Sequence, residues 1–246
     1  MVDQAAPTDE RRSPLERLLS VIAPVRGGEG LTAFMLTLNV TFLMTAYYLI
    51  KPVREGLFLA SPGGAELKSY TGAGSALLLM VIVPYYGKLV DLMPRNRLIG
   101  TVTAIFVFCM LGFYGASQSP TLLPHLAIPF YLWLSVFSMM VIAQFWAFAN
   151  DLYDDEQGKR LFAILGLGAS TGSVVGAKLN EWLLTPPDFL PLPRLSVFEL
   201  LLVSAALLAA TMGMTQWVHL REGASRKARA SKERPKGAYA LVMANR

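Results

Sequence analysis

Two cations and a carboxylate in residues 47–55, YYLIKPVRE, are the side chains best suited to chemistry. On a helix, Lys51 lies one turn from both Arg54 and Glu55, so the three charges share a face beside Tyr47. Arginine can fork onto phosphate or carboxylate oxygens, and lysine adds a compact positive charge. We therefore expect these four residues to bind an anionic solute. The alternative is that both cations extend to a membrane interface, where tyrosine is also common.

A second charged group is the turn 87–97, GKLVDLMPRNR. It holds Asp91, Arg95 and Arg97, which can pair with one another or with a neighbouring helix end in one conformation and separate in another. We expect these three residues to form a conformational latch. Short loops on the inner side of a membrane also contain such residues for topological reasons alone.

Three polar residues, Asn39, Gln144 and Asn150, stand in otherwise apolar segments. Amides at such positions either line a substrate pathway or hydrogen-bond across helices. Both interpretations stay open, and we count these three among the candidate substrate-binding residues.

The elements that position these groups are six apolar segments, each near or above the roughly 20 residues needed to cross a bilayer. They cover about 31–59, 70–90, 97–116, 126–149, 161–184 and 195–219. The composition agrees, with 54% hydrophobic residues, only 16% charged residues and a mean hydropathy of +0.45. We predict an all-α, polytopic membrane protein with six transmembrane helices.

The fifth segment carries Gly168, Gly172 and Gly176 at every fourth position. This spacing lets two helix backbones approach closely in lipid, so we expect the glycines to serve helix packing. The charged stretch before it, from Asp151 to Arg160, is expected to be a short water-facing turn.

Positive charge is distributed unevenly along the chain, and this predicts its orientation. If the amino end is inside, 17 of the 22 Lys and Arg residues lie on the inner side, and the outer side keeps Lys51, Arg54, Lys68, Lys178 and Arg194. Both termini should therefore be cytoplasmic, in a bacterial inner membrane. The net charge of +5 then reflects topology and anionic lipid, and no nucleic-acid partner is expected.

Three regions are expected from this pattern: an amino-terminal segment (1–30), a transmembrane domain (31–220) and a basic cytoplasmic tail (221–246). In the first region, Ser13, Pro14 and Glu16 form a helix-start signature, and Leu15, Leu18, Leu19 and Ile22 recur at helical spacing. A short amphipathic helix on the membrane surface is expected there, with a solvated tail as the alternative.

Catalytic chemistry has little support in the sequence. The single cysteine, Cys109, lies in an apolar segment, and His125 and His219 are the two histidines. We therefore expect no catalytic residue, no metal site and no cofactor, and we do not expect an enzyme.

Three stretches resemble known transporters. The pattern G-x-L-x-D-x-x-x-R-x-R at 87–97 resembles the loop between helices 2 and 3 of major facilitator transporters, where it serves as a latch. FWAFANDLYDDEQGKRLFAILGLGAS (145–170) resembles the helix 4 to helix 5 hairpin of the bacterial and plastid ATP/ADP translocases. AYYLIKPVREGLFL (46–59) is similar to the end of their first helix, where basic residues are implicated in nucleotide transport, and these map onto Lys51 and Arg54.

The resemblance implies the amino-terminal half of a major-facilitator-like bundle, because the translocases have about twice as many helices. It also implies a transporter, or transporter half, that moves a nucleotide such as ATP/ADP or another phosphorylated metabolite by alternating access. The expected partners are the lipid bilayer, this anionic substrate, and a second copy or a separate second half. The alternative is a non-transporting membrane scaffold or split-transporter subunit.

Overall fold

The computed structural model describes residues 13–59, 63–187 and 193–233, apart from the side chains of Asp91 and of residues 224–233. In these ranges the secondary structure is helical. The elements are α1 (Pro14–Leu19), α2 (Gly30–Leu59), α3 (Gly64–Leu92), α4 (Arg95–Ser117), the short 3₁₀ helix η2 (Leu123–His125), α5 (Ala127–Leu152), α6 (Asp155–Leu184) and α7 (Leu200–Glu233). Six of them are long and apolar enough to cross a membrane. The predicted all-α fold with six transmembrane helices is confirmed.

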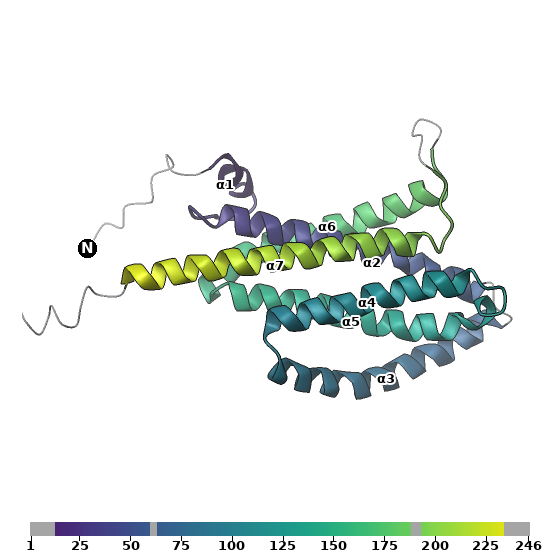
Figure 1. Ribbon diagram of the computed structural model, residues 1–246. Helices are drawn as coiled ribbons and strands as arrows, with labels where there is room; N and C mark the ends of the chain where they lie inside the picture. The colour runs from purple at the N-terminus through teal and green to yellow at the C-terminus, as the bar shows by residue number, and fades with distance from the viewer. Residues whose placement is uncertain (1–12, 60–62, 188–192, 234–246) are drawn as a thin grey trace, which may run out of the picture.

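The six long helices run side by side in one bundle (Figure 1). Helix α2 is central and packs most extensively on α6 and α7, whereas α3 lies at one edge and packs chiefly on α5. Helix α1 and the end of α7 lie at the same end of the bundle, as an even number of crossings requires.

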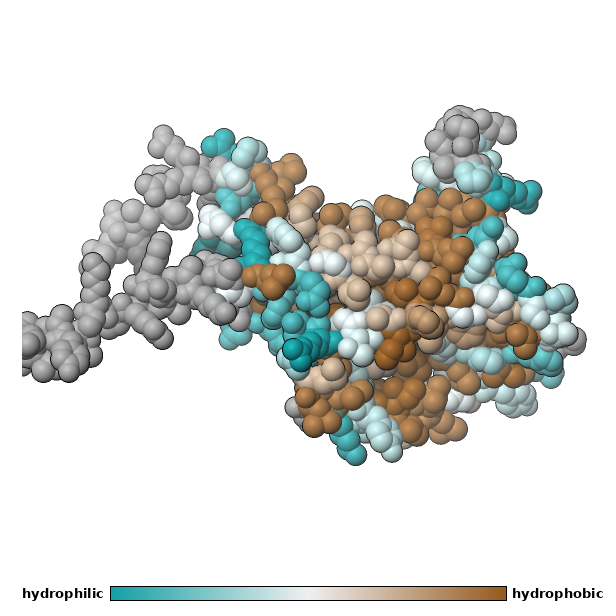
Figure 2. Space-filling model, viewed as in Figure 1, coloured by the Kyte–Doolittle hydropathy of each residue, from teal (hydrophilic) through white to brown (hydrophobic). Residues whose placement is uncertain are grey.

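The surface confirms an integral membrane protein. Figure 2 shows apolar residues gathered over the middle of the molecule, with polar residues towards its two ends. Large side chains such as Met80, Phe108 and Val174 are 69–79% exposed, which water would disfavour and lipid accepts.

Three helix starts differ from the sequence prediction. Helix α3 begins at Gly64, six residues before the expected span 70–90. Helix α6 begins at Asp155, six residues before the expected span, because the side chain of Asp154 accepts a hydrogen bond from the Gln157 N–H and the side-chain oxygen of Gln157 accepts one from the Asp154 N–H. This reciprocal cap turns most of the expected water-facing turn into helix. Helix α7 begins at Leu200, five residues later than expected, and continues to Glu233, so part of the expected cytoplasmic tail is helical.

The amino-terminal helix has the cap that the sequence predicts. The Ser13 N–H donates to the Glu16 carboxylate at 2.8 Å, and the Glu16 N–H donates to the Ser13 hydroxyl at 3.2 Å. Glu16 also accepts from the Gly28 N–H at 2.6 Å, which ties α1 to the start of α2. Leu18 in this helix and Val21 just after it are 68% and 85% exposed, an arrangement that suits a membrane surface.

The backbones of α2 and α6 lie in close contact at Gly168, Gly172 and Gly176. A Cβ added to Gly172 would lie 2.9 Å from the Thr41 Cα, and one added to Gly176 would lie 2.9 Å from the Thr45 Cα. The hydroxyls of Thr41 and Thr45 donate to the carbonyls of Gly168 and Gly172 at 3.0 and 3.1 Å. Small residues and interhelical hydrogen bonds are the interactions that associate helices in lipid.

The substitution Gly172→Ala should force α2 and α6 apart and lower the free energy of unfolding by about 1–3 kcal/mol, the usual effect of overpacking. Thermal unfolding of the purified protein in detergent measures this. Gly166→Ala in the same helix is the matched control, because a Cβ there meets no atom within 4 Å. An equal loss of stability in both variants would contradict the packing role of Gly172.

Candidate functional site

An open groove of about 550 Å³ lies between α2, α3 and α5. Arg54 and Tyr47 line it from α2, Ser75 from α3, and Ser135 and Ser138 from α5, together with apolar side chains of α3 and α5. Each serine hydroxyl donates to a carbonyl of its own helix, at 2.7 to 3.1 Å. The volume lies within the range of small-molecule sites, and Arg54 gives the groove a positive charge.

Arg54 joins the groove to a cluster of charges at one end of α2. Its Nε and Nη2 donate to the Glu55 Oε1 at 3.0 and 2.7 Å, and the Nζ of Lys68 donates to the other carboxylate oxygen at 2.6 Å. The guanidinium also lies 5.0 Å from the ring centroid of Tyr131 on α5. The cluster therefore brings together side chains from α2, α3 and α5.

Sequence reasoning did not select Lys68. It stands just before the expected span 70–90, where a lysine is typical of an ordinary membrane interface. Lys68 reaches Glu55 only in the folded protein, where the start of α3 lies beside the end of α2.

Lys51 does not take the place that the helical spacing predicts. Its Nζ lies 5.2 Å from the ring centroid of Tyr48. Tyr48 faces α6, since its Cβ would be 2.8 Å from a Cβ added to Gly176. Lys51 therefore lies on the α6 side of α2, while Arg54 faces α3 and α5. Attraction between the lysine ammonium and the Tyr48 ring turns the flexible Lys51 side chain away from Arg54.

Asn39 and Gln144 lie in the core of the bundle, each only 2% exposed. The Asn39 Nδ2 donates to the Thr211 carbonyl at 2.9 Å and to the Thr215 hydroxyl at 3.1 Å, so it fastens α2 to α7. Gln144 shares with Asn39 a void of about 20 Å³. Its amide atoms make no hydrogen bond of normal geometry to the described residues, although Tyr86 lies within reach. The void has room for one water molecule.

The segment 87–97 contacts two neighbouring helices at the start of α4, and the first contact is from Gln216 of α7, whose Nε2 donates to the Asn96 carbonyl at 3.2 Å. The Nε of Arg95 donates to Asp151 at 2.7 Å, and so links the start of α4 to the end of α5. Arg97 is exposed, and the side chain of Asp91 lies outside the described residues. Of the expected latch residues, Arg95 thus pairs with a neighbouring helix end in this conformation.

The same end of the molecule carries a partly buried ion pair that has no sequence signal. Arg160 donates to both oxygens of Glu29 at 3.0 and 3.1 Å, and Gln157 donates to Glu29 at 3.1 Å. Both charged side chains are less than one-fifth exposed. Burial raises the pKa of Glu29, but the hydrogen bonds from Arg160, from the Arg26 N–H and from Gln157 outweigh it and hold that pKa below its ordinary value.

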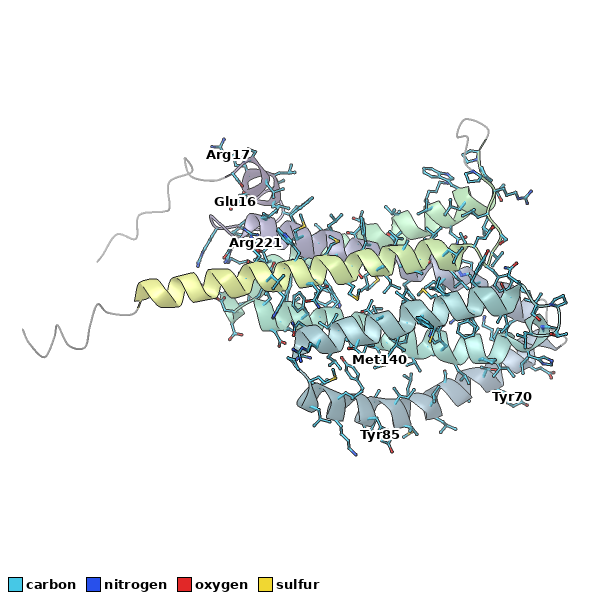
Figure 3. All side chains as sticks on the ribbon, viewed as in Figure 1. Glu16, Arg17, Tyr70, Tyr85, Met140 and Arg221 are labelled. Atoms are coloured by element: carbon cyan, nitrogen blue, oxygen red, sulfur yellow. The ribbon has the colours of Figure 1, made fainter. Side chains whose placement is uncertain are left out.

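Two further residues shape this end. Asn150 is exposed and borders an open hollow of about 520 Å³ with Tyr153 and Lys159. Burial raises the pKa of Tyr153, whose hydroxyl has no partner among the described residues. At the same end, Arg221 donates to the Thr32 hydroxyl at 2.9 Å and ties α7 to α2 (Figure 3).

No family profile and no solved structure matches the chain. It is 25% identical over 210 residues to ADP,ATP carrier protein 1 of Rickettsia typhi, and 25% identical over 210 residues to the protein of the same name from Chlamydia pneumoniae. With ADP,ATP carrier protein 1 of Rickettsia bellii it shares 23% identity over 203 residues.

The chain resembles the ADP,ATP carrier proteins. This confirms the resemblance that the motifs at 46–59 and 145–170 predict. The similarity covers 68–71% of this chain but only 40–41% of each of these carrier proteins. The chain therefore spans about two fifths of the length of the relatives it matches.

The Glu29 ion pair predicts a pH dependence of stability. Since the folded-state pKa lies below the ordinary value of 4.5, the stabilisation is fully present above that value and is lost as the pH falls through the lower folded-state pKa. Glu29→Gln should destabilise the protein at pH 7 and flatten this part of the pH profile. Unfolding temperatures between pH 7 and pH 3 measure it.

The control is Glu156→Gln, which removes a carboxylate that is 74% exposed and pairs with Arg26 at 3.4 Å. It should leave the profile close to wild type, because exposed ion pairs contribute little. The network is unimportant if Glu29→Gln gives the same profile as Glu156→Gln.

Proposed function

We propose that this chain is a transporter half that moves an anionic solute, a nucleotide such as ATP or ADP or another phosphorylated metabolite, by alternating access. The observation that supports it most is the placement of Arg54 in a groove of about 550 Å³ between helices that cross the membrane. Ionisable residues inside membrane bundles mark substrate pathways. The carrier proteins that this chain resembles are named for ADP and ATP.

The groove offers groups suited to such a solute. Arg54 can form two parallel hydrogen bonds to a phosphoryl group, and its planar head keeps that geometry. Tyr47 presents an aromatic face, and Ser75, Ser135 and Ser138 present hydroxyls along the groove. Lys51, beside Tyr48, contributes positive charge that attracts anions to this end of α2.

Alternating access needs two conformations with different contacts. We propose that the Arg95–Asp151 pair stabilises one of them by holding the start of α4 to the end of α5. Asp91 and Arg97 complete this latch in the proposal. Breaking it would let α4 and α5 separate at this end and open the opposite conformation.

The proposal includes a second half that completes the groove, either another copy of this chain or a separate chain. Its support is that the similar carrier proteins are about two and a half times as long as the matched region. Halves of this fold class are parallel repeats about an axis along the membrane normal, so two such chains can pair without inversion. We also propose that both termini lie in the cytoplasm and that the membrane is a bacterial inner membrane; the support is the uneven distribution of positive charge along the chain.

Arg54→Ala should reduce exchange of labelled ATP for ADP in proteoliposomes by about tenfold or more, because hydrogen bonds to a charged group are lost. Lys51→Ala should reduce it less, since Lys51 lies beside Tyr48 rather than in the groove. The matched control is Lys178→Ala, which removes an exposed cation that pairs with Glu181 at 2.8 Å. Normal exchange in the Arg54 variant would contradict the anion site.

The latch predicts a separate effect. Arg95→Gln and Asp151→Asn should each slow exchange while leaving the affinity for the anion near wild type, because neither residue lies in the groove. Exchange rates measured over a range of substrate concentrations separate the two effects. Variants that alter affinity and not rate would show that the pair has another role.

A further inference from the structure

The carboxylate of Glu55 lies between two cations. It accepts three hydrogen bonds from two cations on different helices: two from Arg54 on α2, at 3.0 and 2.7 Å, and one from Lys68 on α3, at 2.6 Å. Both Arg54 donors converge on one oxygen, and Lys68 takes the other. This converging set of charged donors is the pattern that recognises phosphate.

We propose that Glu55 is a built-in competitor, a resident anion that the transported anion must displace from Arg54 and Lys68. The inference rests on the proposed function and deepens it. It assigns Lys68 as a second cation of the site beside Arg54, and it gives Glu55 a role opposite to substrate binding. The ligand class that follows is a solute with a phosphoryl group, whose oxygens are spaced much like those of a carboxylate.

The exposure of the cluster makes displacement feasible. The side chains of Glu55 and Lys68 are 40% and 42% exposed, so water weakens their attraction. Rotation of the Glu55 side chain is enough to move its carboxylate away from Arg54 and Lys68. Arg54 is only 20% exposed and reaches both Glu55 and the groove. A phosphoryl group carries up to two negative charges against the single charge of Glu55, so it competes well for the same donors.

Glu55 also has a role when no substrate is bound. Two cations close to a membrane core disfavour each other and the surrounding lipid unless an anion compensates them. Glu55 supplies that compensation whenever no solute is bound. The groove can therefore change conformation in either state without carrying uncompensated charge.

Binding of inorganic pyrophosphate and of ATP to the purified full chain in detergent tests the inference, with titration calorimetry as the readout. Glu55→Gln should tighten pyrophosphate binding about tenfold, because the neutral amide no longer competes for the cations. Lys68→Gln should weaken it by a similar factor. Glu181→Gln is the matched control, since it removes the exposed carboxylate that pairs with Lys178 at 2.8 Å, and it should leave binding unchanged.

The outcomes separate the two proposals. Absence of pyrophosphate and ATP binding in wild type and in every variant overturns the proposed function and the inference with it. Wild-type binding that Arg54→Ala abolishes, but that Glu55→Gln weakens or leaves unchanged, overturns the inference alone. If Glu55→Gln fails to fold, Lys68→Gln decides: unchanged pyrophosphate affinity in that variant overturns the assignment of Lys68 and the competitor role of Glu55.

Discussion

The close contact between α2 and α6 is the constraint on which the rest of the bundle depends. In lipid no hydrophobic force draws helices together, so association rests on backbone proximity and on hydrogen bonds between helices. Three glycines of α6 let its backbone approach α2, and Thr41 and Thr45 add hydrogen bonds to α6 carbonyls. Asn39 fastens the neighbouring side of α2 to α7. Helix α2 is thereby fixed in rotation, and the direction of every side chain on it follows.

That fixed rotation determines the site. With its glycine-facing side against α6, α2 turns Tyr47 and Arg54 towards α3 and α5, and Lys51 towards the other side. Helix α3, which carries Lys68 and Ser75, is held much less firmly. Only 6% of its most apolar 18-residue stretch is buried inside the bundle. Low burial is typical of elements that move. The groove thus has one rigid wall that carries Arg54 and one loosely held wall that carries Lys68.

Some of this architecture could be predicted from sequence because lipid imposes simple rules. Apolar length gives the six spans, and the helix-start signature at Ser13 gives the cap of α1. The rotation of each helix could not be predicted, since helices that are apolar all round show no face, and so Asn39 and Gln144 could not be distinguished from groove residues. The start of α6 differs from the prediction because Asp154 and Gln157, polar residues of an expected turn, cap a helix. Pairs such as Glu29 with Arg160, 131 residues apart, carry no local signal.

The most direct test of the account is whether a phosphorylated anion occupies the groove. With the single cysteine removed as Cys109→Ser, Ser138→Cys places a thiol in the groove, and Gln118→Cys places one on the exposed loop after α4. The rate of alkylation by a water-soluble maleimide is then measured with and without ATP. The account predicts that ATP slows labelling at position 138 and leaves position 118 unchanged. Equal labelling at position 138 with and without saturating ATP would contradict it.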